Sequence, residues 1–318
     1  MEPDSTRPAP AISVVLPVYN GARYLRQAVG SILEQTFRDF ELICVNDGST
    51  DHSQELLEAL AKKDDRIRIV SRPNSGIVGA LNDGIAVARG KYIARMDADD
   101  VSMPTRFEKQ IAFLRAYPAI VAVGCHVLRI DPEDRPIGPE EFPTDHVTIL
   151  RRLRMGEGGK IPHPGVMIRK DALEKIGGYR QKYQWVEDLD LYLRLGEVGE
   201  LANLPEVLLY YRFQFESVNM TRQGQQAAII LECLQETAGR TGEPFEKSEE
   251  MLRWLSRPLD RQIQRQSWAR RALACGYWNT ARVLSFRNVV QHPLVYDHWR
   301  VFLLSLLRRR KLFTKAAA

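Results

Sequence analysis

The chain has 318 residues, of which 44% are hydrophobic and 27% are charged, with a formal net charge of +5 and a pI near 9.0. This is the composition of a globular protein, long enough for one large domain or two smaller ones. The first 200 residues contain no basic stripe with interleaved aromatic side chains, which argues against nucleic acid as a partner.

The cysteines and the N-terminal residues indicate the compartment. Four cysteines lie far apart in the sequence, without the paired spacing of a disulfide framework or a zinc site, and this favours a reducing environment. Residues 1–11 are polar and rich in proline, so we expect a disordered tail rather than a signal peptide. No stretch approaches the ~18 apolar residues of a membrane span. We therefore expect a cytoplasmic protein that does not cross a membrane.

Strand and helix patterns alternate along the first hundred residues. Strands are predicted at 12–19, 40–47, 66–72 and 90–97, and helices at 22–35, 53–63 and 76–88. This alternation predicts βαβ units, with a parallel sheet covered by helices on both faces. Ligands of such sheets bind at the carboxyl ends of the strands, so we expect the chemistry in the loops that follow them.

The remaining sequence changes character twice. A helix (105–118) and a strand (119–130) are followed by a proline-rich acidic loop (131–143). From about Gln223 onward the pattern is helical only. We therefore expect a disordered tail at 1–11, an α/β domain at 12–222 and a helical C-terminal extension at 223–318.

Three carboxylates, Asp97, Asp99 and Asp100, lie within four residues at the end of the fourth predicted strand. Such a cluster repels itself unless it is compensated. A solvated turn that caps the next helix is one interpretation. The position at the ligand-binding edge favours a divalent cation held by carboxylates and substrate phosphate oxygens.

A second acidic pair, Glu187 and Asp188, starts the predicted helix in "QWVEDLDLYLRL". The helix dipole stabilises carboxylates at this position, so the pair needs no catalytic explanation. A reaction that activates a hydroxyl group does need a positioned carboxylate as its general base, and this pair is the candidate.

From Ile12 to Tyr211 the chain resembles the inverting glycosyltransferases of family 2, which have the GT-A fold. The resemblance lies in "SVVLPVYNGARYLRQAVGSILEQTFRDFELICVNDGSTD", "NSGIVGALNDGIAVARGKYIARMDADD" and "EDLDLYLRL", in the family's order. It implies a Rossmann-like α/β domain with a mostly parallel sheet. It also implies metal-dependent, inverting sugar transfer from a nucleotide-diphosphate sugar, with UDP favoured, to a glycan or lipid-linked glycan in surface-polysaccharide assembly.

The resemblance implies a nucleotide site at the first two strand ends. Pro17, Val18, Tyr19 and Asn20 would surround the base, and the Tyr19 ring can stack on uracil. Asp47 resembles the carboxylate that accepts the uracil imide N–H, although an ordinary Asp-Gly turn is the alternative.

The resemblance extends to the other loops. Asn74 and Asn82 would line the nucleotide pocket or cap the adjoining helix. Asp97 resembles the residue that binds the ribose and Asp99 the ligand of Mn²⁺ or Mg²⁺, whereas Asp100 would support its neighbours.

Near the acceptor, Asp188 resembles the family's general base and Glu187 its orienting or acceptor-binding partner, whereas Asp190 is expected to be structural. His163 lies between two prolines, which predicts an extended loop that approaches the donor diphosphate or the acceptor. Without the resemblance it would be interpreted as a surface residue. Gly177, Gly178 and Tyr179 resemble the glycine turn that precedes the acceptor segment, and a purely conformational role is the alternative.

Other functions were weighed against sugar transfer. A sugar nucleotidyltransferase would show a glycine-rich loop with Arg or Lys after the first strand, and "PVYNGARY" has none. The missing G-x-G-x-x-G excludes a Rossmann dehydrogenase more firmly. An inactive sugar-nucleotide-binding module is the alternative from a different class. The presence of Asp47, Asp97, Asp99 and Asp188 together argues against it, and UDP-sugar turnover decides it. Specificity is expected to lie in the loop from Asp131 to Ile161.

The C-terminal residues predict a helical hairpin of 265–290 and 292–313, broken near Pro293. An apolar stripe on the second helix precedes the basic cluster Arg308 to Lys311. Its members are Trp299, Phe302, Leu303, Leu306 and Leu307. Two interpretations stay open: the stripe packs on the rest of the protein, or it contacts the inner face of the cytoplasmic membrane peripherally.

Overall fold

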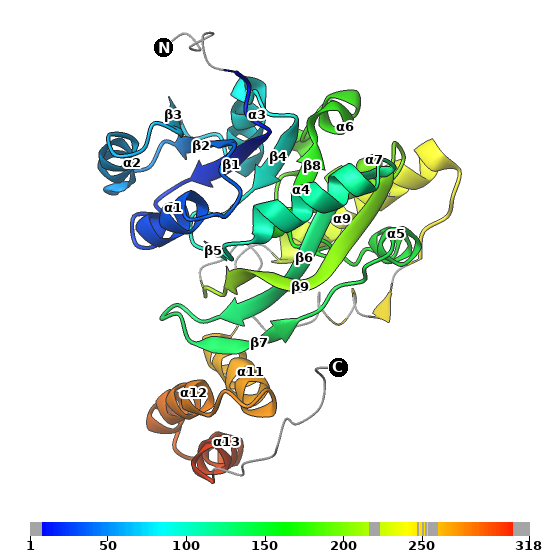
Figure 1. Ribbon diagram of the computed structural model, residues 1–318. Helices are drawn as coiled ribbons and strands as arrows, with labels where there is room; N and C mark the ends of the chain where they lie inside the picture. The colour runs from blue at the N-terminus through cyan, green and yellow to red at the C-terminus, as the bar shows by residue number, and fades with distance from the viewer. Residues whose placement is uncertain are drawn as a thin grey trace. The chain divides into compact units, whose positions relative to one another are not determined.

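The computed structural model describes residues 8–215, 223–246, 248, 249, 251, 253 and 260–307. Most of the expected tail, the boundary expected at residue 222 and the basic cluster 308–311 lie outside these residues. The part described is an α/β fold built on one mixed sheet, followed by helices (Figure 1).

Four parallel strands form the first half of the sheet, in the order β3-β2-β1-β4. They are β1 (Ile12–Val18), β2 (Phe40–Asp47), β3 (Ile67–Arg72) and β4 (Tyr92–Arg95). Every residue of β1 and β2 is buried, as is usual for parallel strands covered on both faces. The four strands predicted from the sequence are confirmed.

Helices cover both faces of the sheet, as predicted (Figure 1). Because side chains alternate along a strand, Val14 and Leu16 enter one core and Val15 the other. The first core contains side chains of α1 (Leu25–Leu33), α2 (Ser53–Ala61) and α4 (Arg106–Ala116). The second contains side chains of α3 (Ile77–Val87), α5 (His146–Arg154), α6 (Lys170–Lys175) and α7 (Glu187–Leu195).

Strands of both directions extend the sheet beyond β4. They are β8 (Met167–Arg169), β6 (Ile120–Ile130), β9 (Glu200–Arg212) and the short β5 (Val101–Ser102), with β7 (Pro136–Glu140) paired to β6. β8 is antiparallel to β4 and to β6, and β5 is antiparallel to β9. The expectation of a loop throughout 131–143 was wrong, because this segment contains β7. Proline is tolerated at the first residue of a strand, which is where Pro136 lies.

The chain forms two compact units. One comprises Met1–Val127, Glu140–Tyr211 and Val218–Arg257, and the other Leu128–Pro139, Arg212–Ser217 and Pro258–Ala318. Helix α9 (Gln223–Thr241), expected in the C-terminal extension, belongs to the first unit. The reason is packing: Ile230, Cys233 and Leu234 of α9 share a core with side chains of α7.

The second unit contains α11 (Arg261–Ala274), α12 (Trp278–Gln291) and α13 (Tyr296–Leu306). The prediction of one helix over 265–290 was wrong. Gly276 has φ +80°, a left-handed conformation that ends α11 and separates it from α12. None of the helices described is both long enough and apolar enough to cross a bilayer.

Candidate functional site

The loops that follow the parallel strands contact one another at one edge of the sheet. Asn20 joins the first two loops, since its backbone N–H donates to Ser49 Oγ (3.0 Å) and its Oδ1 accepts from Thr50 N–H (2.8 Å). A Cβ built on Gly21 would lie 3.3 Å from the Ala98 Cβ, in the acidic segment. The residues predicted from separate loops therefore share one edge, as expected for βαβ units.

The base-stacking candidate lies at the surface of this edge. Val18 is buried at the end of β1, whereas the Tyr19 ring is 57% exposed. Pro17 precedes them inside the strand. Asn20 has φ 51°, and its side chain is occupied in joining the loops. Tyr19 is thus the member of this group that is open to a planar ligand.

Asp47 is buried at the end of β2 and is already engaged in hydrogen bonds. Its two carboxylate oxygens accept from the backbone N–H groups of Ser75 (3.0 Å) and Gly76 (2.9 Å), at the start of α3. Arg72 Nε lies 3.2 Å from Oδ1. The Asn74 side-chain amide donates to the Asp47 backbone carbonyl (2.9 Å). Asp47 therefore fixes the amino end of α3.

The three carboxylates of the acidic segment are close together. One ligand atom of each of Asp97, Asp99 and Asp100 lies within 4.8 Å of the others, and Asp100 is buried. Asp97 forms a two-pronged ion pair with Arg95, with N–O distances of 2.6 Å at both oxygens. The oxygen-rich donor set suits a hard divalent cation.

Arg95 is buried at the end of β4, between this cluster and the second acidic pair. Burial lowers the pKa of its guanidinium. Asp97 and Tyr179 raise that pKa by more than burial lowers it, so the net pKa is raised. In turn, the positive charge of Arg95 contributes a lowering effect to the pKa of Glu187, of Asp188 and of His163. For the two carboxyl groups this effect opposes the larger effect of burial. Arg95 is the cation shared by the groups predicted to bind the donor and the acceptor.

Glu187 and Asp188 start α7, as predicted. Burial and the neighbouring Asp188 raise the pKa of Glu187 to about 7. Burial also raises the pKa of Asp188, whose Oδ1 accepts the Leu189 backbone N–H (2.8 Å). Trp185, just before the pair, has φ 78°, a strained conformation for a bulky residue. Glu187 therefore keeps its proton into the neutral pH range.

His163 was expected in an extended loop and, without the resemblance, at the surface. Both expectations were wrong. It begins a 3₁₀ turn (His163–Gly165), and its side chain is buried. Its Nε2 lies 2.7 Å from the Tyr179 hydroxyl, and its ring packs edge-on against Tyr192. Burial, and then Arg95, lower the pKa of His163 well below its usual value, so the ring is neutral.

Three buried polar atoms of this region lack a hydrogen-bond partner among the described residues. They are Arg95 Nε, Glu187 Oε2 and Tyr192 Oη. The charges of Arg95 and Glu187 both affect the pKa of Tyr192, and the charge of Arg95 affects that of Glu187, so the three side chains are electrostatically coupled. Because buried polar groups are normally satisfied, these atoms are candidates to bind a polar ligand.

The carboxylate pair is held by a separate network. Asp190 is 1% exposed and forms ion pairs with Arg180 and with Arg194 (2.6 Å), which confirms its structural role. Arg180 also pairs with Glu236 of α9, which accepts from the Tyr183 hydroxyl as well (2.7 Å). Helix α9 therefore supports the segment that leads into the Glu187–Asp188 pair.

The sequence analysis did not predict Arg95 or Tyr192 as site residues, and it predicted Tyr179 only as part of a turn. The signal for Arg95 was present: it is a cation within an apolar strand, two residues before Asp97 and so on the same face. Tyr179 follows two glycines with φ +74° and +69°, and the Asn82 side chain bonds both its N–H (3.0 Å) and its carbonyl (2.9 Å). Asn82 thus holds this turn, and no sequence pattern indicated that contact.

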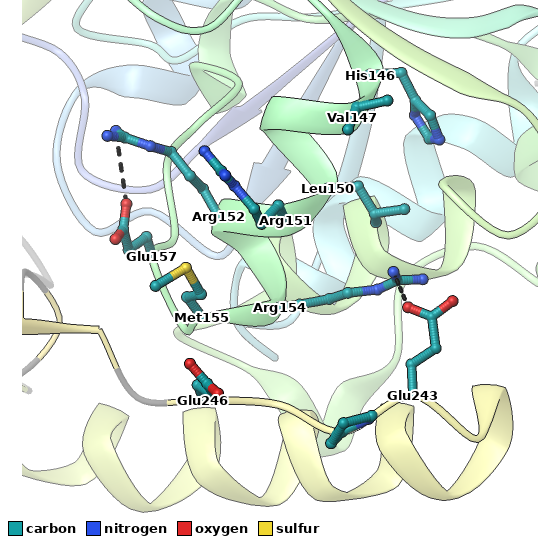
Figure 2. Close-up of a pocket in the computed structure, with 11 residues that line it drawn as sticks. His146, Val147, Leu150, Arg151, Arg152, Arg154, Met155, Glu157, Glu243 and Glu246 are labelled. Atoms are coloured by element: carbon teal, nitrogen blue, oxygen red, sulfur yellow. Dashed lines mark ion pairs between the residues drawn. The ribbon is translucent and has the colours of Figure 1, made fainter.

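A cleft of about 800 Å³ lies elsewhere in the first unit, lined by α5 and residues 243–246 (Figure 2). It falls partly in the segment expected to set specificity. Its charges balance: Arg152 pairs with Glu157 (3.7 Å), and Arg154 with Glu243. None of the predicted site residues lines it, and its paired arginines do not form a ready diphosphate site.

Comparison with known proteins shows the family. The family model described as glycosyl transferase family 2 matches residues 13–177. A glycosyltransferase of Haemophilus influenzae, named as uncharacterized, is 31% identical over 232 residues, which cover 70% of this chain and 72% of that protein. The amylovoran biosynthesis glycosyltransferase AmsE of Erwinia amylovora is 33% identical over 217 residues, 66% of this chain and 79% of its own.

Solved structures share the fold at low identity. Mannosyltransferase PcManGT from Pyrobaculum calidifontis, in complex with GDP-Man and Mn²⁺, matches with a TM-score of 0.56 and 19% identity, over 96% of this chain and 86% of that one. S. aureus TarS 1-349, in complex with UDP-GlcNAc, matches with a TM-score of 0.56 and 17% identity. The match covers 93% of this chain and 79% of the TarS chain. The chain belongs to glycosyl transferase family 2 and is a glycosyltransferase of the GT-A fold, which transfers a sugar from a nucleotide sugar.

Proposed function

We propose that this glycosyltransferase inverts the anomeric centre, depends on a divalent metal and uses a UDP-sugar to glycosylate a hydroxyl group of a glycan or lipid-linked glycan. One observation supports this above the others. Arg95 joins the Asp97 cluster to the Glu187–Asp188 pair, in a region where buried polar atoms lack partners. A donor and an acceptor bound on either side of Arg95 would supply those partners.

The acidic cluster fits a metal. Its three carboxylates offer oxygen atoms within 4.8 Å of one another, the ligand type that Mg²⁺ and Mn²⁺ prefer. We assign Asp99 as the protein ligand, Asp100 as its support and Asp97 as the ribose-binding residue oriented by Arg95. A bound divalent cation stabilises the negative charge that develops on the leaving diphosphate.

Asp188 is the general base in this proposal. An acceptor hydroxyl is a weak nucleophile until a positioned carboxylate takes its proton as the new bond forms. The Leu189 N–H orients the Asp188 carboxylate, and Arg95 favours its ionised form. Glu187, with a pKa of about 7, is protonated over more of the neutral range and can bind or orient the acceptor.

Uridine is the nucleoside that we propose. Tyr19 offers an exposed ring for stacking, with Pro17, Val18 and Asn20 shaping its loop. Asp47 Oδ2 accepts the Gly76 N–H and retains a lone pair for the uracil imide N–H. Asn74 holds the loop after β3 against Asp47 by donating to the Asp47 backbone carbonyl. His163 would contribute to donor binding indirectly, by orienting the Tyr179 hydroxyl.

Product stereochemistry tests this proposal. A single displacement with one base inverts the anomeric carbon, so an α-linked UDP-hexose is expected to give a β-linked product. A screen of UDP-sugars for donor hydrolysis identifies the substrate, and the anomeric coupling in the proton NMR spectrum reports the linkage. A retained α linkage contradicts the mechanism, and failure to turn over any nucleotide sugar would favour the inactive binding module.

Arg95→Met is expected to lower activity most at acid pH. Arg95 lowers the pKa of both Glu187 and Asp188, so its removal raises them, and the base is then ionised only at higher pH. The acid limb of the kcat/KM profile should move to higher pH, so the loss of activity should be larger at low pH than at high pH. Arg95→Lys keeps the positive charge, so the acid limb of its kcat/KM profile should lie closer to that of the wild type. An unshifted limb in the methionine variant contradicts this role.

A further inference from the structure

Helices α11, α12 and α13 (orange to red in Figure 1) bury polar side chains beside a small apolar cluster that includes Trp268, Leu284 and Val301. The buried polar set comprises Gln266, Thr280, Ser285, Asn288, His298 and Ser305. They are satisfied internally: the Asn288 amide donates to Gln266 Oε1 (3.0 Å), and Gln266 donates to the Asp297 backbone carbonyl (3.1 Å). Helices in water normally turn their apolar side inward, so this arrangement leaves apolar side chains to be explained.

Those apolar side chains are exposed. The apolar face comprises Val290, Leu294, Tyr296, Trp299, Leu303 and Leu307. Tyr296 is 79% exposed, Leu307 65% and Val290 63%. Half-buried Phe302 joins α12 to α13, because its ring contacts both Phe286 (5.4 Å between centroids) and Trp299 (6.3 Å).

The face runs along one side of α13. Tyr296, Trp299, Leu303 and Leu307 follow one another at intervals of three or four residues, which places them on one side of a helix. The opposite side carries His298, Val301 and Ser305, all buried. Single exposed apolar residues are common on proteins, but a continuous apolar side indicates an interaction surface.

The net charge of residues 258–318 indicates what binds the apolar face. Residues 258–318 contain ten arginines and two lysines against two aspartates and no glutamate, a net charge of +10. Because the whole chain carries +5, the other 257 residues carry a net −5. A second copy of the chain would bring two strongly cationic segments together. A bilayer surface with anionic lipids attracts the segment, at roughly 1 kcal/mol per basic residue near the surface.

We infer that the apolar face of α12 and α13 is a docking surface for an anionic lipid bilayer. Helix α13 has 11 residues and is about 16 Å long, against the ~30 Å of a hydrocarbon core, so it lies in the interface and does not cross. Exposed Arg300 lies on the same helix, where it can reach headgroup phosphates, and Trp299 and Tyr296 are of the type enriched at this depth. The inference concerns the location of the enzyme and holds whichever sugar is transferred.

Cosedimentation with vesicles tests it on the full chain. The protein is expected to pellet with vesicles that contain an anionic phospholipid at low salt, and much less with phosphatidylcholine alone or at high salt. The variant L303Q/L307Q should lower the partition coefficient by a factor on the order of 10 or more, because two exposed leucines no longer insert. Tyr117→Gln, the same kind of change on a 54% exposed side chain at the end of α4, should sediment like the wild type.

Hydrolysis of the soluble donor is measured in parallel and should be equal in all three proteins, which shows that they are folded. Equal sedimentation of L303Q/L307Q and the wild type overturns the inference, as does a wild type that stays in the supernatant with both kinds of vesicle. A wild-type dimer that the double variant converts to a monomer, without vesicle binding, would assign the face to a second copy. Loss of donor turnover in every protein with vesicle binding intact would contradict the proposed reaction and leave the docking surface standing.

Discussion

Asp99→Ala is expected to reduce sugar transfer to background. The proposed metal stabilises charge that grows on the leaving diphosphate, a contribution of several kcal/mol that corresponds to a factor on the order of 10³ in rate. Excess EDTA should silence the wild type, and Mn²⁺ or Mg²⁺ should restore it. Transfer of the donor sugar, measured with each metal added back, checks the result.

Asp65→Ala is the matched control for this change. Asp65 is an exposed carboxylate that precedes β3 and so lies at the amino end of the strands, whereas Asp99 follows the carboxyl end of β4. Its removal should leave both the rate and the metal dependence unchanged. Full activity of the wild type in excess EDTA would rule out the metal assignment. An inactive Asp99→Ala protein with lowered thermal stability would instead indicate a folding defect.

Asp188→Asn is expected to lower kcat by a factor on the order of 10² or more, the usual contribution of a general base. Asparagine keeps the shape and can still accept the Leu189 N–H, but it cannot take the acceptor proton. The nucleotide should bind as before, because the change is made on the acceptor side. Single-turnover rates at saturating acceptor, together with calorimetric UDP affinity, separate these two quantities.

Asp190→Asn, the same change two residues along the helix, should give the opposite pattern. Asp190 pairs with Arg180 and Arg194 in a buried network, and breaking such a pair costs about 3–5 kcal/mol of folding stability. Its thermal midpoint should fall, with a smaller loss of kcat in the folded fraction. If UDP affinity instead falls in parallel with rate in Asp188→Asn, then Asp188 belongs to the donor site.

The parallel half of the fold was predictable because its signal is local. The apolar runs at 12–19, 40–47, 66–72 and 90–97 alternate with helical periodicity, and each became the expected strand. The second half of the sheet, in which strands of both directions pair, was harder. β7 begins with a proline, and its pairing to β6 depends on contacts that no local pattern records. Likewise, one residue, Gly276 with its positive φ, turned an expected helix into two.

The sequence was sufficient to predict that the candidate carboxylates lie at strand ends and at a helix start. Carboxylates at the ends of strands and at the start of a helix are recognisable because their residue type and position follow from βαβ geometry. The structure brought the predicted Asp97, Asp99 and Asp100 within reach of a common ion. Their individual roles, and those of Glu187 and Asp188, remain predictions for the experiments above.

The sequence did not predict the long-range contacts, which only the folded structure shows. Arg95 became the shared cation, and His163 a buried neutral partner of Tyr179, through packing between residues far apart in the sequence. Helix α9 joined the first unit through Glu236 and its apolar side. Strand and helix periodicity depend on neighbours a few residues away, and so can be read along the chain. The pKa of a carboxyl group and the exposure of a helix face depend on whatever three-dimensional packing places beside them.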